Sequence, residues 1–561
     1  MSLPSRARGI SFDCTCVGCT KPIFVMPSRI SGRRPSSANV WPEAKISDSA
    51  GEFLLGVVWV ITSLNLVPFD RIRPTSRGWP AARPIEPSMG ALLIAPSPSW
   101  YAAGSADTTD GTWSIITCFG GRAWPPHIRP LTRTRTLPAM RETSLVEINL
   151  AAVSHNLRLL KRIVGDSCRL CPIVKADAYG LGAPRIARTL IGAGADMLAV
   201  YDPAEATELL KRAITAPILV LMPVREIDRL DEIYRALICR RLHLTVHDDA
   251  HLNDLITVAE RFGAAIPVHL EIDTGMSRGG CDADDALALI ERISRHPRLQ
   301  LAGLYTHFAH AEADLDFTDR QFTQFNEIID HAGDFIPEDC LIHCASTFAT
   351  LRAQRYHRSM IRIGLAWAGY GLEMIEGGEI IIEGEKLQPA VVWKSHLVQV
   401  RSVPKGRTIG YSATWTAPRD AVIGVVPVGY ADGYPMNLGA SDAKLANDTP
   451  GGMVRLRIDA NGRTESCDVP VVGAVNMDQI TIDLTDAVAR FGRAAIDVGM
   501  TVELVSDDRA ASNHLPALAE SGGTFAHEML CRLNPRLKRE YVLREPVHVE
   551  VDVAEKVVAA G

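Results

Sequence analysis

Short apolar runs recur between residues 171 and 363, and a polar stretch of helix-forming composition follows each of them. The runs are Cys171–Val174, Met197–Val200, Ile218–Leu221, Leu242–Val246, Val268–Ile272, Leu301–Tyr305, Leu341–His343 and Met360–Ile363. Strands of a parallel sheet are apolar throughout, because helices cover both faces of the sheet. Eight such units in succession predict an α/β fold with a closed (β/α)8 barrel, a TIM barrel.

The pattern changes after about Gly377 to β-rich segments separated by Gly, Pro and Asp turns. These segments predict a second, mostly antiparallel β domain with a short helix at Thr524–Arg532. Before the barrel, an alternating strand at Ser144–Asn149 precedes a helix at Leu150–Val164. We therefore place the barrel at residues 141–376 and the β domain at residues 377–561. The strands expected in the β domain lie in Ala390–Val403, Ala421–Val428, Val454–Ile458, Val469–Val475, Met500–Leu504 and Val547–Val553.

Residues 1–140 differ from the rest, with thirteen Arg but two Lys, six of the nine Trp and sixteen of the 34 Pro. Frequent Pro and Ser without periodicity disfavour a packed core. The segment is a disordered extension, a targeting or anchoring region, or upstream sequence translated from a start site placed too early. We favour the last, because Met140 directly precedes the first patterned element. The apolar run Phe53–Phe69 is at the low edge of membrane-spanning length, and no membrane association is expected.

The overall composition excludes some classes of function. A net charge of −6 without a basic excess argues against a nucleic-acid partner. The twelve cysteines have no repeating spacing, and several lie in apolar segments as reduced core thiols do. Cys14, Cys16 and Cys19 are not followed by a second CxxC pair, so no metal site is expected. Cysteine usage therefore predicts a reducing, cytoplasmic compartment.

Lys175 directly follows the first apolar run, and active sites of such barrels gather at the C-terminal ends of the strands. Desolvation at the rim of a dry core lowers the pKa of a lysine and favours Schiff-base chemistry. The alternative is a lysine that extends out of the barrel mouth into solvent. Gly180 and Gly182 then give a turn into a helix, which suits a nearby anion.

Polar residues also end four other predicted strands. Each alone has a structural explanation, such as a satisfied histidine or a structural ion pair. Together they exceed what packing requires and predict a ligand site at the barrel mouth. They are Glu271 and Asp273, with Arg278 in the next turn, then His307, Ser346, Thr347, Arg362 and Gly364.

The segment Ile-Val-Lys-Ala-Asp-Ala-Tyr-Gly-Leu-Gly around Lys175 resembles the lysine motif of the alanine racemases, which are pyridoxal-phosphate-dependent enzymes of fold type III. The resemblance runs from about Thr143 to the C-terminus and implies a (β/α)8 barrel followed by a β domain. It implies interconversion of L-alanine and D-alanine, which supplies D-alanine for peptidoglycan. Further motifs follow in the family's order: His-Leu-Glu-Ile-Asp-Thr-Gly-Met-Ser-Arg, Leu-Tyr-Thr-His-Phe-Ala, Ile-Arg-Ile-Gly-Leu, Gly-Tyr-Ser-Ala-Thr-Trp, Gly-Tyr-Ala-Asp-Gly and Asn-Met-Asp-Gln.

The resemblance implies that Lys175 holds pyridoxal 5'-phosphate as a Schiff base and acts as base on one face of the substrate Cα. Tyr411 would act on the opposite face, because racemisation needs one group to remove a proton and another to deliver it. In the family this tyrosine reaches the site of the partner subunit, which implies an obligate homodimer.

The remaining roles follow from the same resemblance. Arg362, held by His307, would bind the pyridine nitrogen and leave it unprotonated, because arginine keeps its proton. Tyr430 would line the substrate entrance. The phosphate would be held by Tyr179, Ser346, Thr347, Gly364 and Leu365, and the substrate carboxylate by Arg278 and the backbone N–H of Met477.

Four departures from the family pattern bear on substrate preference. Glu271 stands where many relatives carry a carbamylated lysine, and we expect its carboxylate to supply that charge and pair with Arg278. The alternative is that Glu271 fills a hydrated barrel site. The other three are His527 in place of a tyrosine near the phosphate, Ala474 in place of an arginine, and Asn476 in place of cysteine or serine.

Three alternatives stay open at this point. One is a racemase of the same fold with a broader amino-acid range. Another is a barrel-fold amino-acid decarboxylase, which Tyr411 and Arg362 disfavour because decarboxylation benefits from a protonated pyridine. The third is a non-enzymatic pyridoxal-phosphate carrier, which the predicted β domain disfavours.

Overall fold

The computed structural model describes residues 143–375, 387–447, 451–460 and 463–544, all within one compact unit, His127–Gly561. The segment 1–140, with its apolar run and Cys14, Cys16 and Cys19, lies outside the described residues, as does the predicted strand Val547–Val553. Among the described residues, no helix combines the length and the apolar character needed to cross a membrane. The same residues contain no cluster of three or more His, Cys, Asp or Glu side chains suited to a metal ion.

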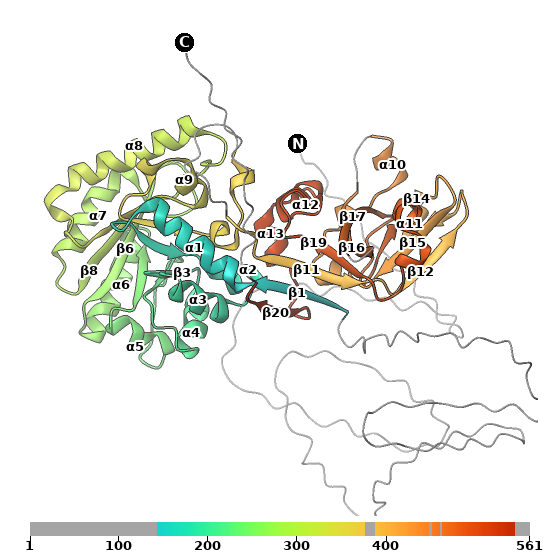
Figure 1. Cartoon of the computed structure of the whole chain (residues 1–561). Coiled ribbons are helices and arrows are strands. Elements are labelled where there is room, and N and C mark those ends of the chain that lie inside the picture. Colours follow the sequence, from blue (N-terminus) through green and yellow to red (C-terminus); the bar gives the residue numbers. More distant parts are fainter. Residues whose placement is uncertain (1–142, 376–386, 448–450, 461–462, 545–561) are drawn as a thin grey trace, which may run out of the picture. The chain divides into compact units, whose positions relative to one another are not determined.

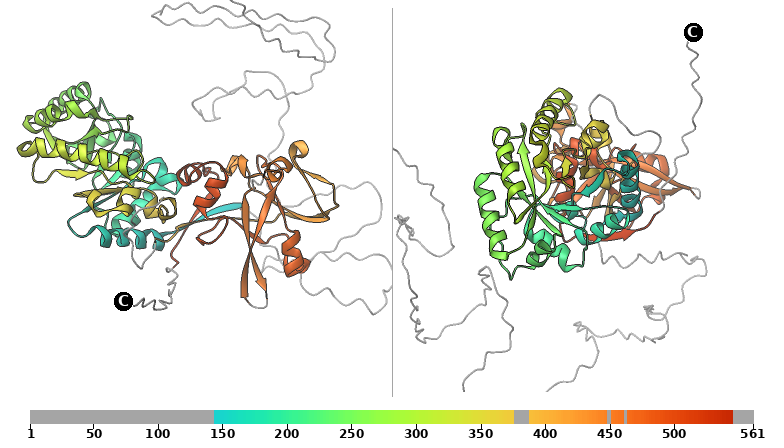
Figure 2. Two further views of the ribbon diagram at one scale, coloured as in Figure 1. Left: turned by 90° about the horizontal axis from the view of Figure 1, so that it is seen from above. Right: turned by 90° about the vertical axis from the view of Figure 1, so that its left-hand side faces the viewer.

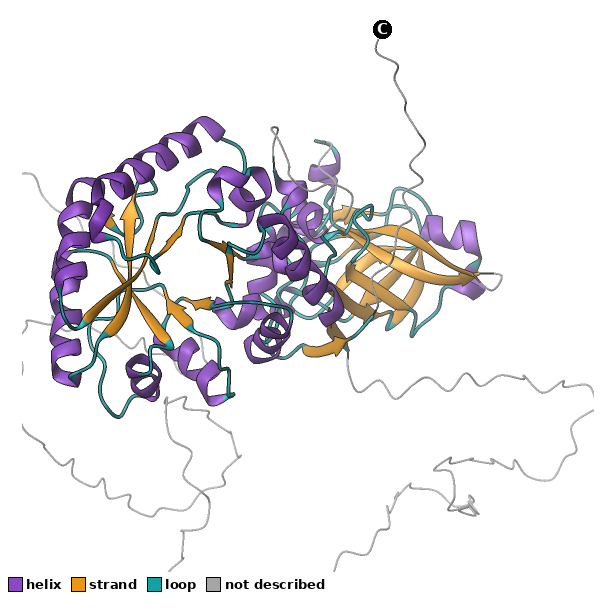
Figure 3. Ribbon diagram, turned by 60° about the vertical axis from the view of Figure 1, so that its left-hand side comes forward, coloured by secondary structure: helices purple, strands orange, loops and turns teal. Residues whose placement is uncertain are grey.

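Eight parallel strands form the barrel, and helices surround them (Figure 3). The pairing runs β3-β4-β5-β6-β8-β9, and β10 pairs with β2. A bridge between Ile173 and Ala199 joins β2 to β3, and the Arg362 N–H donates to the Ala345 carbonyl at 2.9 Å, linking β10 to the segment after β9. All eight predicted strands are confirmed. They are β2 (Arg169–Pro172), β3 (Leu198–Val200), β4 (Ile218–Val220), β5 (Leu242–Val246), β6 (Ile266–Asp273), β8 (Leu299–Tyr305), β9 (Leu341–His343) and β10 (Met360–Ile363), with β7 (Cys281–Asp282) paired to the end of β6.

The barrel helices are amphipathic and begin at polar caps. In α1 (Leu150–Val164), Leu157 and Leu160 are buried, and the Asn149 side chain accepts a hydrogen bond from the Ala151 N–H at 3.1 Å. The other helices are α3 (Ala183–Gly192), α4 (Pro203–Lys211), α5 (Glu232–Ile238), α6 (Asp249–Phe262), α7 (Ala283–Arg295), α8 (Leu315–Ala332) and α9 (Thr347–Arg352), with 3-10 turns η1 (Gly333–Phe335), η2 (Gln354–Tyr356), η3 (Leu365–Ala368) and η4 (Leu372–Met374).

The segment labelled α2 (Lys175–Gly180) is a left-handed turn. Ala176, Asp177, Ala178 and Tyr179 have φ angles of 52°, 54°, 53° and 57°. Each such residue costs about 1–2 kcal/mol, because its Cβ crowds the following carbonyl oxygen. The Ala178 N–H donates to the Val174 carbonyl at 2.9 Å, and the Asp177 carboxylate accepts from the Ala183 N–H at 2.7 Å. Backbone strain that surrounding hydrogen bonds maintain is typical of a functional site.

The β domain is a nine-stranded sheet of order β12-β15-β18-β17-β16-β19-β11-β1-β20 (Figure 1). Its pairs are antiparallel except for β1 with β20. The sequence placed the first strand with the barrel, whereas β1 (Ser144–Asn149) pairs with β11 (Val391–His396) and belongs to this sheet. The other strands are β12 (Gln399–Val403), β15 (Ala421–Val426), β16 (Met453–Ala460), β17 (Arg463–Val472), β18 (Ile480–Asp483), β19 (Thr501–Val505) and β20 (Lys538–Val542), with a hairpin of β13 (Thr408–Ile409) and β14 (Trp415–Thr416).

Short helices connect these strands, and the predicted helix within Thr524–Arg532 is confirmed as α13 (Ala526–Cys531). Figure 2 shows the mainly helical exterior of the barrel in green and the strand-rich β domain in orange. The other helical elements are α10 (Asp442–Leu445), α11 (Thr485–Phe491), α12 (Leu515–Ser521), η5 (Tyr411–Ala413), η6 (Tyr430–Asp432), η7 (Met436–Leu438) and η8 (Arg493–Ala495).

Strand β20 and the segment before it hold the turn that follows Lys175. Arg539 donates from Nε to the Gly180 carbonyl at 3.0 Å, and the Tyr541 hydroxyl donates to the Leu181 carbonyl at 3.0 Å. Gly182 has a φ of 91°, and a Cβ there would lie 1.9 Å from the Tyr541 hydroxyl oxygen, so this position favours glycine. The β domain therefore helps to fix the backbone beside the lysine.

Candidate active site

A cavity of about 710 Å³ lies at the C-terminal ends of the barrel strands. Each strand contributes through its last residues or the turn after it, which is the arrangement expected for a barrel active site. Leu365 is buried directly behind Gly364 and does not line the cavity. The sequence-predicted residues that line it are Lys175, Tyr179, Glu271, Arg278, His307, Ser346, Thr347, Arg362 and Gly364.

Lys175 has a lowered pKa. Burial is the main cause, and the positive charge of Arg278 adds to it, while Glu205 and Cys531 oppose the shift. The Glu205 carboxylate is occupied with backbone groups, accepting from the N–H of Ala176 at 2.5 Å and that of Tyr201 at 2.8 Å. A neutral amine is therefore more accessible at Lys175 than at an ordinary surface lysine.

Arg362 is buried and held in a fixed orientation. Its Nη2 donates to the Thr306 carbonyl at 2.9 Å and to His307 Nδ1 at 3.1 Å, which is the contact the resemblance implied. Its Nη1 donates to His343 Nδ1 at 2.8 Å and to the carbonyl of the same residue at 3.0 Å. The guanidinium carbon lies 4.8 Å from the ring centre of Tyr305. Arginine keeps its proton in proteins, so this group is a permanent donor.

His307 is neutral. Burial holds its pKa well below the ordinary value, and the positive charges of Arg362, Arg278 and Lys175 lower it further. A neutral imidazole can accept a hydrogen bond at Nδ1 and donate from Nε2, so the contact with Arg362 fixes which ring nitrogen carries the proton.

Thr347, Gly364 and Tyr179 lie together on one side of the cavity, and we call them the cradle. The Thr347 hydroxyl accepts from the N–H of Gly364 at 3.0 Å and of Ala366 at 3.3 Å. A Cβ on Gly364 would lie 2.5 Å from the Tyr179 hydroxyl oxygen. Burial raises the pKa of Tyr179, which therefore keeps a proton to donate. Two hydroxyl groups beside a residue without a side chain fit a phosphate group.

His527 of α13 lies against this cradle. The His527 ring meets the Tyr179 ring edge-on, with centroids 5.6 Å apart. The Tyr179 ring also stacks on the Trp367 ring, with centroids 5.8 Å apart. Burial, and then the charge of Lys175, lower the pKa of His527 to about 4. The residue therefore offers a neutral ring where the family pattern has a tyrosine.

The predicted ion pair between Glu271 and Arg278 is wrong for this structure. The buried Glu271 carboxylate accepts from the Tyr305 hydroxyl at 3.0 Å and lies 3.2 Å from His247 Nδ1. Arg278 is exposed, and no ion pair of the described residues involves it. Gly279 and Gly280, which follow Arg278, pack against Glu271, but the Glu271 carboxylate contacts Tyr305 and His247 while the Arg278 side chain is exposed.

Tyr411, Tyr430 and Met477 form an exposed cluster on the β domain, and none of them lines the barrel cavity of the same chain. They are 74%, 40% and 54% exposed. Their turns are adjacent, because the Tyr430 N–H donates to the Asn476 carbonyl at 3.0 Å and Gly410 packs against Ala474. The structure thus divides the predicted site residues into a barrel group and this surface group.

Three residues that contact Glu271 or Arg362 were not assigned to the site at the sequence level: Tyr305, His343 and His247. Tyr305 and His343 are the last residues of β8 and β9, and His247 directly follows β5. Their position at the C-terminal ends of strands could have identified them, because that position identified Lys175 and His307.

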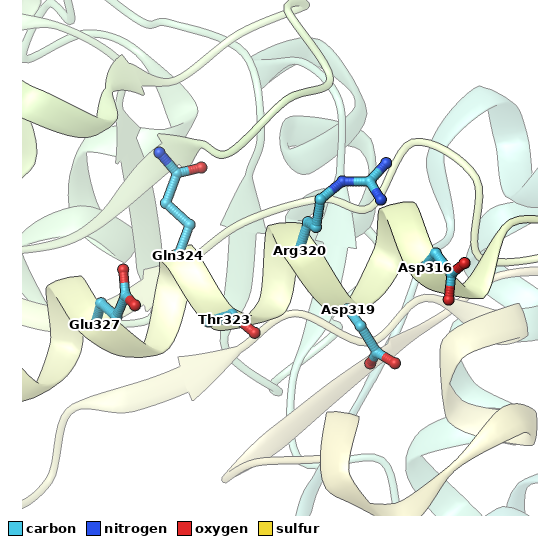
Figure 4. Close-up of a pocket in the computed structure, with 6 residues that line it drawn as sticks. All are labelled: Asp316, Asp319, Arg320, Thr323, Gln324 and Glu327. Carbon is cyan, nitrogen blue, oxygen red and sulfur yellow. The ribbon is translucent and has the colours of Figure 1, made fainter.

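A second hollow of about 500 Å³ lies on α8 and has a different character (Figure 4). All six lining residues come from this one helix, and they are Asp316, Asp319, Arg320, Thr323, Gln324 and Glu327. Side chains of one helix face do not converge on a ligand from several directions, so the barrel cavity is the better candidate site.

The fold and the cavity define a class of two-domain enzymes with a (β/α)8 barrel, a lysine of lowered pKa beside an anion cradle, and a β domain. Comparison with known proteins identifies the family within this class. The family model of the alanine racemase N-terminal domain matches residues 148–372, and that of the alanine racemase C-terminal domain matches residues 390–541. An alanine racemase from Sorangium cellulosum is 34% identical over 417 residues, which cover 72% of this chain and 100% of the relative. The chain belongs to the alanine racemase family.

Solved structures agree with this assignment. Alanine racemase from Bacillus anthracis with bound L-Ala-P has a TM-score of 0.58 and 27% identity, covering 72% of this chain and 96% of that chain. Alanine racemase from Bartonella henselae with covalently bound pyridoxal phosphate has a TM-score of 0.57 over 71% of this chain and 99% of that chain. At 23% identity, the second likeness supports the fold alone.

Proposed function

We propose that the protein is an alanine racemase that interconverts L-alanine and D-alanine with pyridoxal 5'-phosphate. The observation that carries the proposal is the convergence of Lys175, the Thr347–Gly364–Tyr179 cradle and Arg362 on one cavity. The barrel cavity supplies groups for both ends of the cofactor, the phosphate and the pyridine ring.

Lys175, the cradle and Arg362 would each bind a different part of the cofactor. Lys175 would be the covalent attachment point, and the hydroxyls of Tyr179 and Thr347 beside Gly364 would hold the phosphate. When bound, the cofactor withdraws electrons from the substrate Cα and so makes its proton acidic. Arg362 donates to the ring nitrogen and keeps its own proton, so the nitrogen is not protonated.

Lys175 and Tyr411 transfer the proton at the substrate Cα from opposite faces. The lowered pKa of Lys175 makes its amine available as a base at the Cα proton. Arg278, which lines the cavity, and the Met477 N–H hold the substrate carboxylate, and Tyr430 lines the entrance. Glu271 and Tyr305 line the same cavity and are joined by a hydrogen bond.

The second group comes from another copy of the chain. Tyr411, Tyr430 and Met477 lie together, are exposed, and do not line the cavity of their own chain. In a two-fold dimer each chain presents the same surface to the other, so one β domain can complete the partner's barrel site.

Hybrid dimers test this assembly. Lys175→Ala and Tyr411→Phe chains are each inactive alone, but a mixed dimer contains one site with an intact lysine and an intact tyrosine. Random mixing of equal amounts makes half of the dimers mixed, so about one quarter of wild-type activity returns. No recovery, despite subunit exchange verified by mass, means that both residues act in one chain.

The activity itself is tested with L-alanine in D2O. The proposal requires D-alanine that carries deuterium at Cα, and Lys175→Ala must abolish it. Release of carbon dioxide instead identifies a decarboxylase. Equal rates on alanine and on serine, lysine or arginine identify a racemase of broader range.

We also place the enzyme in the cytoplasm, where it supplies D-alanine for peptidoglycan. The eight cysteines among the described residues are all free thiols, and five of them are buried. Reduced thiols in these numbers are usual for proteins of a reducing compartment.

A further inference from the structure

Three histidines form a hydrogen-bonded chain through the barrel interior that begins at Arg362. His343 Nδ1 lies 2.8 Å from Arg362 Nη1, and His343 Nε2 lies 2.9 Å from His269 Nδ1. His269 Nε2 in turn lies 2.9 Å from His243 Nδ1. The rings come from three parallel strands, β9, β6 and β5, and each contact joins one ring nitrogen to the next.

The chain has only one possible polarity. Arg362 has donors and no acceptor, so His343 Nδ1 must accept. A neutral His343 then carries its proton on Nε2 and donates to His269 Nδ1. By the same step, His269 donates from Nε2 to His243 Nδ1. As long as every contact of the chain is a hydrogen bond, only one tautomer of each histidine is compatible with the donor at Arg362.

Burial keeps the three rings neutral. It lowers the pKa of His243 to about 4 and holds the pKa of His269 and His343 well below the ordinary value. The positive charge of Arg362 lowers the pKa of both inner histidines further. A charged ring would have two donors and would break the sequence of N–H···N contacts.

The fold makes room for this arrangement. A Cβ on Gly303 of β8 would lie 2.2 Å from His269 Nδ1, so a residue with a side chain would displace the central ring. The Tyr305 ring stacks on His343 with centroids 4.8 Å apart and an interplanar angle of 16°. His243, at the far end, lines a separate cavity of about 160 Å³ together with Arg169 and Gln300, which the active-site cavity does not include.

We propose that His243 is the distal anchor of this histidine chain and a positioning residue for Arg362. His243 supplies the acceptor that keeps the His269 proton on Nε2, and this leaves His269 Nδ1 free to accept from His343. Without that acceptor, His269 can move its proton to Nδ1, where it opposes the Nε2 proton of His343. The orientation of His343, and with it that of Arg362, is then no longer fixed.

A matched pair of variants separates the acceptor from the packing of His243. His243→Asn keeps an oxygen near the place of Nδ1, whereas His243→Leu has nearly the same size and no acceptor. His357→Leu is the control, because His357 is a buried histidine that donates to the Thr350 carbonyl at 2.9 Å and lies outside the chain of contacts.

The first readout is magnetic resonance of the full-length holoenzyme labelled with ¹⁵N-histidine. Couplings between nitrogen nuclei across the two N–H···N bonds are expected in the wild type, with all three rings in the Nε2–H form. His243→Leu must remove the His243 coupling and change the ring ¹⁵N shifts of His269. A wild-type His243 that is charged, or protonated on Nδ1, overturns the inference.

The second readout is kinetic and rests on the proposed racemase activity. His243→Leu is expected to lower kcat between about threefold and thirtyfold at an unchanged KM for alanine, because distant coupled residues have effects of this size. His243→Asn and His357→Leu should stay near wild type. Equal loss in the Leu and Asn variants indicates a packing role and overturns the inference. If no variant or wild type racemises alanine, the proposed function fails while the resonance result still decides the histidine chain.

Discussion

The hydroxyl of Tyr305 donates to the Glu271 carboxylate at 3.0 Å, while the ring of the same tyrosine lies 4.8 Å beneath the Arg362 guanidinium. Tyr305 therefore contacts both the Glu271 carboxylate and Arg362, the arginine that we assign to the cofactor ring. Burial and the negative charge of Glu271 hold the pKa of Tyr305 well above its ordinary value. The phenol keeps its proton and stays a donor.

Replacing Glu271 by Gln tests the value of the carboxylate at this position. The amide keeps the size and an acceptor for Tyr305 but loses the charge next to His247. We expect kcat/KM for alanine to fall about fivefold, since a hydrogen bond to a charged acceptor is stronger than one to a neutral acceptor by about 1 kcal/mol. The measurement is steady-state racemisation with and without bicarbonate.

Bicarbonate provides the control. It should not change the wild-type rate, because Glu271 carries its charge without modification. A Glu271→Lys variant should respond to bicarbonate, since a carbamylated lysine restores a carboxylate there. Unchanged kinetics in Glu271→Gln would remove any functional need for the charge.

The lowered pKa of Lys175 predicts its reactivity with aldehydes. Between the lowered value and the ordinary 10.5, Lys175 is neutral while a free lysine is still protonated. The pH midpoint for attachment of pyridoxal phosphate to the cofactor-free protein should therefore lie below 10.5. Borohydride trapping followed by peptide mass analysis measures this midpoint from about pH 6 to about pH 11.

Arg278→Gln separates the two causes of that shift. Removing the positive charge should raise the midpoint, but burial remains and should keep it below that of free lysine. A midpoint in the wild type equal to that of a surface lysine contradicts the environment described for Lys175.

The barrel was predictable because its signal is local. Each of the eight strands is an apolar run, since both of its faces are covered, and the strand ends identified Lys175, His307 and Arg362 without knowledge of their partners. The β domain was less predictable. Strand β20 (Lys538–Val542) contains Lys, Arg and Glu and lies at the edge of the sheet, so it has no apolar run to detect.

The sequence contains no local pattern that predicts which strands and helices contact one another. The pattern of Ser144–Asn149 gives a strand, but nothing in it specifies that β1 pairs with β11 and β20. In the same way, Tyr305 and His343 are part of apolar runs, and their roles appear only when β8, β9 and β10 lie side by side. The Glu271–Arg278 prediction failed for this reason, because the groups that Glu271 contacts, Tyr305 and His247, belong to other strands or strand ends and are brought to it by tertiary structure.

Gly364→Ala tests the phosphate cradle. The added methyl group would lie 2.5 Å from the Tyr179 hydroxyl oxygen, so that side chain must shift. We expect a loss of about 1–3 kcal/mol in unfolding free energy and weaker binding of pyridoxal phosphate, measured by fluorescence titration of the cofactor-free protein.

Two further variants make this result specific. Gly192→Ala is the control, because a Cβ there meets nothing within 4 Å. Adding Tyr179→Phe to Gly364→Ala removes the crowded oxygen and should recover the unfolding free energy, though not the phosphate affinity. A double variant as unstable as Gly364→Ala alone contradicts the proposed clash.

Stability should fall in mild acid because the buried histidines must stay neutral. The pKa of His527 is about 4 in the folded protein, against 6.5 for the ordinary side chain. Between these values the unfolded chain binds a proton that the folded chain does not, so stability is present above pH 6.5 and is lost as the pH falls towards 4. For one such histidine the loss is about 3 kcal/mol at most.

His527→Phe should remove the contribution of His527 to this loss of stability in acid. Urea unfolding of the cofactor-free protein, followed by tryptophan fluorescence, gives the unfolding free energy at about pH 7 and about pH 5. The wild type should lose more stability over that interval than the variant, because only the wild type contains His527. The variant should still lose some stability, because His243 and the other buried histidines are present in both proteins. Equal losses in the two proteins would mean that His527 is as easily protonated when folded as when unfolded, and that its ring does not lie in the dry contact with Tyr179 described here.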